Sequence, residues 1–290
     1  MNTNSNLYTI VYSTILVVVV AGVLAFVSMA LKPKQQENIA LEKMQNILNA
    51  AALGEDAAQL KSNKAAYIKG LYAEHITNSY ILNIEGKVID GEAFDVDLKA
   101  QYNIMKAIGN AKDDATAQAL KSKLQLPVFV CTIDSMDLNI FPCYGAGLWG
   151  PIWGYLSVED DFATLHGAIF DHKSETPGLG AEIAKPKFYS QFAGKKLEKE
   201  GKFHSIDIVK GGGQVENPNG VDAVSGATIT SRSLQETMAA WFAEYMPYIN
   251  LKREAVEAEN SPCCCGSDTT GVCTNSCQAE TSHATSSPIK

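Results

Sequence analysis

The sequence predicts an α+β protein in which one N-terminal transmembrane helix precedes a domain of mainly antiparallel sheet with flanking helices. Three observations support this class. An uncharged apolar run near the N-terminus is long enough to cross a bilayer. Short apolar segments separated by Gly, Pro and Asp, between residues 126 and 210, are typical of strands. Stretches on both sides of them have the three- and four-residue apolar spacing of helices.

The N-terminal apolar run extends from Leu7 to Leu31, after a short polar tail of residues 1–6. It contains no charged residue, and at about 1.5 Å per residue it is long enough for the ~30 Å hydrocarbon layer. A cleaved signal peptide is the alternative, but the basic segment that precedes the apolar core of such peptides is missing. The run therefore predicts a retained, single-pass membrane anchor.

Residues 32–125 are expected to form a helical and mixed region that packs on the core. Its apolar residues follow helical spacing in several stretches, and Glu85-Gly86 separates two short apolar segments in the manner of a hairpin turn. The expected helices are 35–53, 57–72, 75–78 and 113–124, the segment 94–107 is mixed, and the hairpin joins 80–84 to 87–89.

Residues 126–250 are expected to form the core domain, and residues 251–290 a disordered tail. The tail is rich in Ser, Thr, Ala and Cys and is poor in residues that could form a core. The expected strands of the core are 127–133, 139–144, 152–158, 164–172 and 203–210, and its expected helices are 186–197 and 231–248.

Composition excludes several classes of function. A net charge of −8 argues against a nucleic-acid partner. No cluster of His, Cys, Asp or Glu within residues 32–250 has the spacing of metal ligands, so no metal site is expected there. Five of the seven cysteines lie between Cys263 and Cys277 in a spacing that matches no zinc or iron–sulfur pattern, and binding of a soft metal or disulfide formation are the alternatives for them. Cys131 and Cys143 lie on separate expected strands and either pair or remain buried thiols. No Gly-x-Gly-x-x-Gly follows a strand, so NADH is not expected to bind this chain.

A loop of small residues precedes the last expected helix. Ser225, Gly226 and Ala227 have little side-chain bulk, so a large group can approach their backbone. The helix expected at 231–248 begins beside this loop, and the N–H groups of a first helical turn favour an anion or a phosphate. The plainest interpretation of the loop alone is a Ser/Thr cap before a helix.

Two Gly-rich segments come earlier in the chain. Tyr144–Ile152 places several glycines around Trp149, and Glu175–Gly180 closely follows His172. Each segment alone is typical of a turn. The occurrence of all three segments in this order and at this spacing is improbable by chance.

Together the three segments resemble the signatures of the FMN-binding domain family. The string Asp222-x-x-Ser225-Gly226-Ala227-Thr228 is similar to that family's flavinylation motif, whose last Thr carries FMN through a phosphoester bond. The resemblance implies that Thr228 carries FMN covalently. A Thr hydroxyl is a poor nucleophile until its proton is removed, and the resemblance implies that a flavin transferase using FAD and a divalent metal supplies this activation.

The resemblance also implies the other cofactor contacts. Trp149 and Leu179 are expected to cover the flavin ring, and backbone N–H groups of the Glu175–Gly180 loop to reach its polar edge. Glu175 either accepts a hydrogen bond from N3 of the flavin or orients its own loop. The expected cofactor-binding residues are Gly147, Leu148, Trp149, Glu175, Thr176, Gly178, Leu179, Gly180, Asp222, Ser225, Gly226, Ala227, Thr228 and Thr230.

Within the family, the anchor and the long segment between it and Tyr144 resemble the flavoprotein subunits of sodium-translocating NADH:quinone reductases. The sister subunits of Rnf-type ferredoxin:NAD oxidoreductase complexes, usually shorter in this segment, are the alternative. The implied function is electron transfer through FMN inside a multi-subunit sodium pump of the bacterial inner membrane. The implied partners are the other subunits, the flavin transferase and membrane lipid.

Two signals disagree about the side of the membrane on which the domain lies. Lys32, Lys34 and Lys43 follow the apolar run and nothing basic precedes it, which would place the domain in the cytoplasm. The resemblance implies a periplasmic domain, and large domains translocate largely regardless of local charge.

Two rival functions are an anchored binding module without flavin and a stand-alone flavoprotein reductase.

Overall fold

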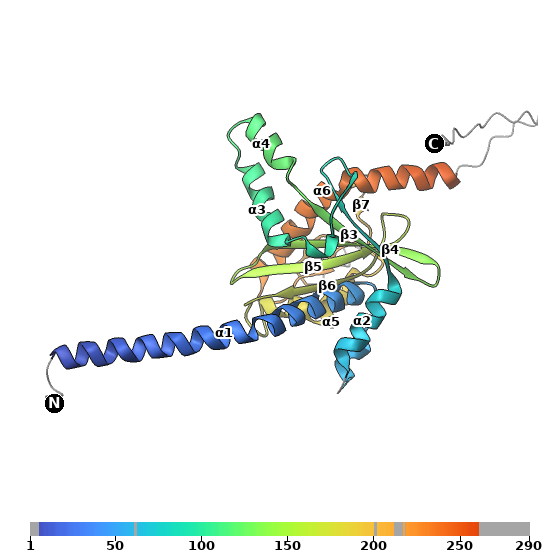
Figure 1. The fold of residues 1–290 in the computed structure, drawn as a ribbon. Helices are drawn as coiled ribbons and strands as arrows, with labels where there is room; N and C mark the ends of the chain where they lie inside the picture. The colour runs from blue at the N-terminus through green and yellow to red at the C-terminus, as the bar shows by residue number, and fades with distance from the viewer. Residues whose placement is uncertain (1–5, 61–62, 200–201, 212–216, 218, 261–290) are drawn as a thin grey trace, which may run out of the picture.

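A computed structural model describes residues 6–60, 63–199, 202–211, 217 and 219–260 of the chain. Its centre is a six-stranded sheet with the strand order β2-β1-β3-β4-β5-β6, in which every neighbouring pair is antiparallel (Figure 1). The strands are β1 (Ile76–Leu82), β2 (Val88–Ile89), β3 (Leu126–Ile133), β4 (Met136–Ala146), β5 (Pro151–Val158) and β6 (Leu165–His172). The predicted α+β class is confirmed.

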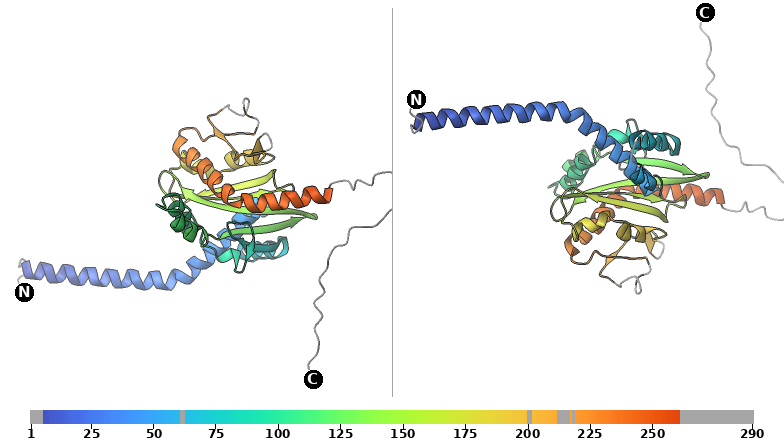
Figure 2. Two further views of the ribbon diagram at one scale, coloured as in Figure 1. Left: turned by 90° about the horizontal axis from the view of Figure 1, so that it is seen from above. Right: turned by 90° about the horizontal axis from the view of Figure 1, so that it is seen from below.

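Helices cover both faces of this sheet (Figures 1 and 2). The helices are α1 (Asn6–Ala50), α2 (Lys64–His75), α3 (Leu98–Gly109), α4 (Asp114–Lys121), α5 (Pro186–Tyr189) and α6 (Thr228–Asn260). Because side chains alternate between the faces of a strand, neighbours such as Ile140 and Phe141 enter different cores. Phe141 packs with α5 and α6, whereas Ile140 packs with the inner end of α1.

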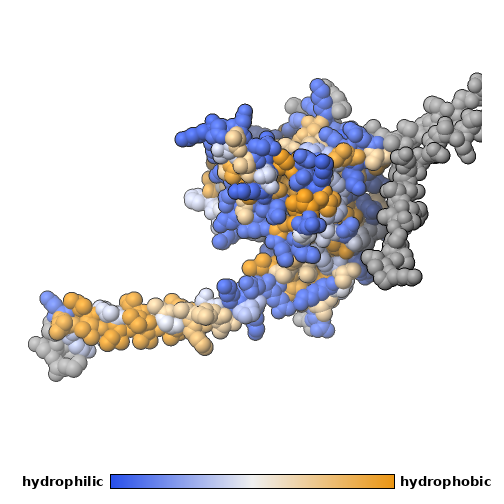
Figure 3. Space-filling view, turned by 45° about the horizontal axis from the view of Figure 1, so that its top comes forward, coloured by the Kyte–Doolittle hydropathy of each residue, from blue (hydrophilic) through white to orange (hydrophobic). Residues whose placement is uncertain are grey.

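The first helix joins the expected anchor to the domain without a break. α1 runs through Pro33, so the anchor and the separate helix expected at 35–53 are one helix of 45 residues. Proline inside a helix removes a hydrogen bond and bends the helix, and Figure 2 shows such a bend along α1. The apolar window of α1 has a mean hydropathy of 2.7 and is 0% buried, as the hydrophobic outer surface in Figure 3 shows. A helix of the domain core would be mostly buried.

α6 packs against the face of the sheet opposite to α1. Trp241 of α6 is 1% exposed, and its Nε1–H donates to the carbonyl of Tyr144 at 2.8 Å. The hydroxyl of Tyr245 donates to the carbonyls of Pro127 and Pro142, which lie on neighbouring strands. α6 therefore contacts β3 and β4 through polar bonds as well as apolar packing. It extends to Asn260, beyond the boundary expected at residue 250, and residues 261–290 lie outside the described part of the chain.

Several local predictions were wrong where tertiary contacts override local pattern. Residues 76–78 were expected to be helical but begin β1, because they pair with β3. The helix expected at 186–197 ends by Phe192, since Gly194 has a φ of 74° and the following lysines pair in extended form beside Leu165. The hairpin expected around Glu85-Gly86 is confirmed.

The strand expected at 203–210 is also mostly absent. Only β8 (Lys202–Phe203) and β9 (Ile208–Val209) are extended, paired with β7 (Glu198–Lys199) and β10 (Val221–Asp222). Between them, His204 bonds to Asp207 at 2.9 Å, and the N–H of Ile208 donates to the side chain of Gln235. Local side-chain bonds thus replace a continuous ladder there.

The two cysteines of the domain are buried thiols. Cys131 faces the core on the α1 side and Cys143 the core on the α6 side, so the sheet separates them and they do not pair. Burial raises the pKa of Cys131 to about 11 and that of Cys143 to about 12. Both therefore stay protonated and unreactive near neutral pH.

We expect Trp241→Ala to lower the free energy of unfolding by about 3–5 kcal/mol, because it empties a buried site and removes the bond to Tyr144. Leu251 on the same helix is 52% exposed, and Leu251→Ala should change stability by no more than about 0.5 kcal/mol. Urea unfolding of the detergent-solubilised chain measures both. A Trp241→Ala loss equal to that of the control would contradict the packing role of α6.

Candidate functional site

Two of the three predicted loops leave the same end of the sheet. β4 and β5 pair as far as Ala146 and Pro151, so residues 147–150 form their connection. β5 and β6 pair through Ile152 and His172, so the chain leaves β6 directly beside that connection. This proximity follows from the antiparallel order, because every second connection between neighbouring strands lies at the same end of the sheet. The Gly-Trp loop and the loop that starts after His172 therefore lie side by side.

The Glu175 side chain ties these two loops to the third. Its Oε1 accepts the backbone N–H of Trp149 at 2.8 Å, and its Oε2 accepts the hydroxyl of Thr230, in α6, also at 2.8 Å. Its own N–H donates to Nδ1 of His172 at 3.2 Å. Glu175 is 4% exposed, so these bonds are sheltered from water. The sequence left two roles open for Glu175, accepting a hydrogen bond from the flavin or orienting its own loop. Because both carboxyl oxygens already accept hydrogen bonds from the protein, the structure supports the second role.

Glycine is required where the loops press on this carboxyl group. A Cβ on Gly147 would lie 2.5 Å from Glu175 Oε1, and a Cβ on Gly180 would overlap Oε2 and approach Thr230 Oγ1 to 2.8 Å. Gly226 has a φ of 77°, a conformation that favours glycine, and a Cβ there would lie 2.8 Å from Leu179 Cδ2. The small residues thus let three segments converge on one point.

Thr228 is the first residue of α6 and is exposed. The first helical bond runs from Ser231 N–H to the Ala227 carbonyl at 2.9 Å, so the N–H groups of the preceding turn have no earlier helical acceptor. A cavity of about 830 Å³ opens beside Thr228, and Lys210 and Arg232 also line it. Arg232 follows Thr228 by four residues, which places both on one face of the helix. Lys210, Arg232 and the helix N-terminus favour a phosphate there, and Glu236 is the one acidic residue among the described residues of the lining.

Exposed apolar side chains stand around the converging loops. Trp149 is 66% exposed, Leu148 47% and Leu179 42%, and Ile229 beside Thr228 is 57% exposed. Large apolar side chains this exposed, gathered on neighbouring loops, are typical of a ligand or partner surface. They meet the requirement of a flavin ring for apolar contact on its faces.

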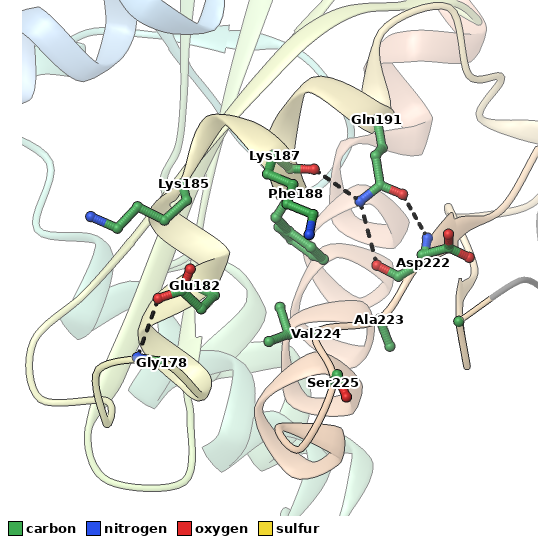
Figure 4. A pocket seen from close by; sticks show the side chains of 11 residues that line it. Gly178, Glu182, Lys185, Lys187, Phe188, Gln191, Asp222, Ala223, Val224 and Ser225 are labelled. Atoms are coloured by element: carbon green, nitrogen blue, oxygen red, sulfur yellow. Dashed lines mark hydrogen bonds between the residues drawn. The ribbon is translucent and has the colours of Figure 1, made fainter.

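Two predicted residues lie in settings that the sequence did not reveal. The N–H of Gly178 donates to Glu182 at 3.2 Å, so this group serves its own loop. Asp222 lies in β10, where its N–H donates to Gln191 Oε1 at 2.9 Å. It lines a second cavity of about 450 Å³ together with Lys187 and Phe188 (Figure 4). Ser225 lines both cavities, so they adjoin.

The other predicted residues lie in or beside the converging loops. Thr176 is exposed, and its carbonyl accepts the N–H groups of Leu179 and Ala181 at 3.1 Å. Sequence reasoning missed Lys210 and Arg232. The spacing of four residues between Thr228 and Arg232 could have identified the arginine, whereas Lys210 is brought near only by the fold. Within the described residues, no group of three or more His, Cys, Asp or Glu could hold a metal ion.

We expect Glu175→Leu to lower the free energy of unfolding by about 2–4 kcal/mol, because the Trp149 N–H and the Thr230 hydroxyl lose their acceptors in a buried site. Glu175→Gln is the matched control, because its oxygen can accept from Trp149 while the Thr230 hydroxyl reverses to accept from the amide. Urea unfolding and hydrogen exchange at Trp149 measure the difference. Equal stability of the two variants would contradict the bonding role.

Comparison with known proteins agrees with this geometry. The model of a family described as "FMN-binding domain" matches residues 147–243, which include the converging loops and the start of α6. The C subunit of the Na(+)-translocating NADH-quinone reductase of Vibrio vulnificus is 30% identical over 78% of this chain and 88% of that protein. The Yersinia pestis protein of the same name is also 30% identical, over 85% of this chain and 92% of that protein.

Solved structures point to the same group. The crystal structure of the corresponding C subunit from Parabacteroides distasonis is 34% identical, with a TM-score of 0.62 over 76% of this chain and 96% of that chain. Shewanella oneidensis NqrC is 30% identical, with a TM-score of 0.58 over 73% of this chain and 97% of that chain. The chain belongs to the NqrC family, the C subunits of Na(+)-translocating NADH-quinone reductases.

Proposed function

We propose that this chain is the membrane-anchored flavoprotein subunit of a sodium-translocating NADH:quinone reductase, with FMN attached to Thr228 through a phosphoester bond. The observation that carries the proposal is the exposed Thr228 hydroxyl at the first residue of α6, in a cavity that also presents Lys210 and Arg232. The names of the relatives, which are subunits of that complex, support the same assignment over an Rnf-type complex.

Attachment needs an activated Thr228 and an accessible phosphorus atom. In the proposed reaction, a separate flavin transferase removes the hydroxyl proton and Oγ1 of Thr228 displaces AMP from FAD, so that one P–O bond forms as another breaks. Ser225, Gly226 and Ala227 leave room for the transferase beside the hydroxyl. Arg232 and the N-terminus of α6 then hold the phosphate charge.

The residues around the site fit a flavin in other respects. Trp149, Leu148 and Leu179 offer exposed apolar contact for the ring faces. Glu175 keeps the loops that carry Trp149 and Leu179 in place without contributing a charge at the surface. Bound FMN would supply one-electron transfer between redox centres, and a ring near exposed loops is open to carriers in other subunits. NADH binding and sodium transport are assigned to those subunits.

Membrane anchoring is part of the proposal. The outer part of α1 is apolar, uncharged from Leu7 to Leu31 and unburied in the described structure, as expected for a single span (Figure 3). We place the domain on the periplasmic side of the bacterial inner membrane, where covalent attachment prevents loss of the flavin. The lysines after the span oppose this orientation, but a domain of this size translocates largely regardless of such charges.

We expect Thr228→Ala to abolish the fluorescent flavin band on a denaturing gel after co-expression with the transferase, because the esterified hydroxyl is gone. Ser190→Ala is the matched control, since it removes an exposed hydroxyl outside the Asp222–Thr228 motif and should keep the band. Folding of both variants is checked by thermal unfolding. A band that persists in Thr228→Ala, or that disappears in Ser190→Ala, would contradict the assignment.

A further inference from the structure

The sheet end that carries the converging loops faces the same way as the outer part of α1. The carboxyl group of Glu42 in α1 lies close to that of Asp171, near the end of β6. Two turns later, the Ala50 carbonyl accepts the Ser157 hydroxyl and lies beside Gly167, near the start of β6. From Ala50 to Glu42, α1 therefore runs toward the end of the sheet that carries the converging loops. The N-terminal part of the helix continues in the same direction. If α1 spans a bilayer, the loop end of the domain faces the membrane.

The α3–α4 hairpin lies at this same end of the domain. Tyr102 of α3 contacts Tyr144, close to the Gly-Trp loop, with ring centroids 5.9 Å apart. Lys99 at the start of α3 lines a cavity shared with Ile39 and Lys43 of α1. Figure 2 shows the hairpin, in green, at the side of the domain nearest the outer part of α1. The hairpin is thus a membrane-proximal element.

This hairpin is basic in an acidic protein. Residues 98–124 contain five lysines and two aspartates, a net charge of +3, whereas the whole chain has a net charge of −8. The lysines are Lys99, Lys106, Lys112, Lys121 and Lys123.

Acidic residues of α6 lie near two of these lysines. Lys121 faces Glu244 of α6, and Lys106 lines a cavity with Glu236 and Glu244. Lys99, Lys112 and Lys123 are exposed; Asp97 lies two residues before Lys99 and Asp113 and Asp114 follow Lys112, whereas no acidic residue lies within two residues of Lys123. These three lysines carry the argument.

The height of Lys99 above the bilayer matches the reach of a lysine side chain. Ile39, which shares a cavity with Lys99, follows Leu31 by eight residues, so it lies at most about 12 Å above the end of the apolar run. The headgroup layer occupies roughly 5–7 Å of that height. The remaining gap is below the Debye length of about 8 Å at physiological ionic strength, and an extended lysine side chain spans much of it.

We propose that Lys99, Lys112 and Lys123 bind the phosphates of anionic phospholipid headgroups, so that the α3–α4 hairpin rests on the bilayer and fixes how the flavin loops face it. The occupant is lipid because the anchor holds this basic surface within reach of the headgroup layer, where phosphatidylglycerol and other anionic lipids carry their negative charge. The inference depends on the proposed anchoring of α1 but not on flavin attachment.

The test uses the full chain in nanodiscs of phosphatidylcholine, with or without added phosphatidylglycerol. Hydrogen exchange of peptides within residues 98–124 should slow by roughly an order of magnitude when phosphatidylglycerol is present, and high salt should remove this protection. The variant K99Q/K112Q/K123Q should lose it. The control K196Q/K199Q/K202Q removes the same charge from exposed lysines near the opposite end of β6 and should keep it.

The outcomes separate this inference from the proposed function. Exchange that does not depend on phosphatidylglycerol, or protection that survives in K99Q/K112Q/K123Q, would overturn the lipid assignment. Protection that arises only when other subunits are added would overturn it too, because the occupant would then be a protein. A chain that fails to co-elute with the nanodiscs would instead contradict the anchoring of α1.

Discussion

One buried carboxyl group holds the candidate site together. Glu175 accepts from a loop between two strands and from the first turn of α6, and its backbone bonds to the strand that precedes it. A buried carboxyl group is costly unless donors satisfy it, so the three segments and Glu175 depend on one another. Gly147 and Gly180 are the consequence, because any side chain there would occupy the space that Glu175 needs. Thr228, two residues before Thr230, is placed by the same bond.

Much of the fold and the three signature loops were readable from the sequence, because each depends on local pattern. The apolar run of the anchor, the hairpin at Glu85-Gly86 and the four short apolar strands between residues 126 and 172 are local signals, and the structure contains them. The small residues around Ser225 also identified a loop before a helix. These predictions agree with the structure because the tertiary contacts favour the same conformation as the local sequence does.

The rest depends on contacts between residues far apart in the chain. Residues 76–78 become a strand only because β3 offers partners, and the lysines after Gly194 become extended because Leu165 does. The role of Glu175 could not be chosen from the sequence, since its two acceptor bonds span 26 and 55 residues. Lys210 reaches the Thr228 cavity in the same way, through the packing of β9 beside α6.

The most direct test of the account is the mass of one peptide from the mature protein. Cleavage after Lys210 and Arg232 releases residues 211–232, which contain Thr228 with Ser225, Thr230 and Ser231 as competing hydroxyls. The account predicts that this peptide carries FMN less one water, with fragment ions that localise the addition to Thr228. An unmodified peptide from fully matured protein, or FMN on another hydroxyl, would contradict it.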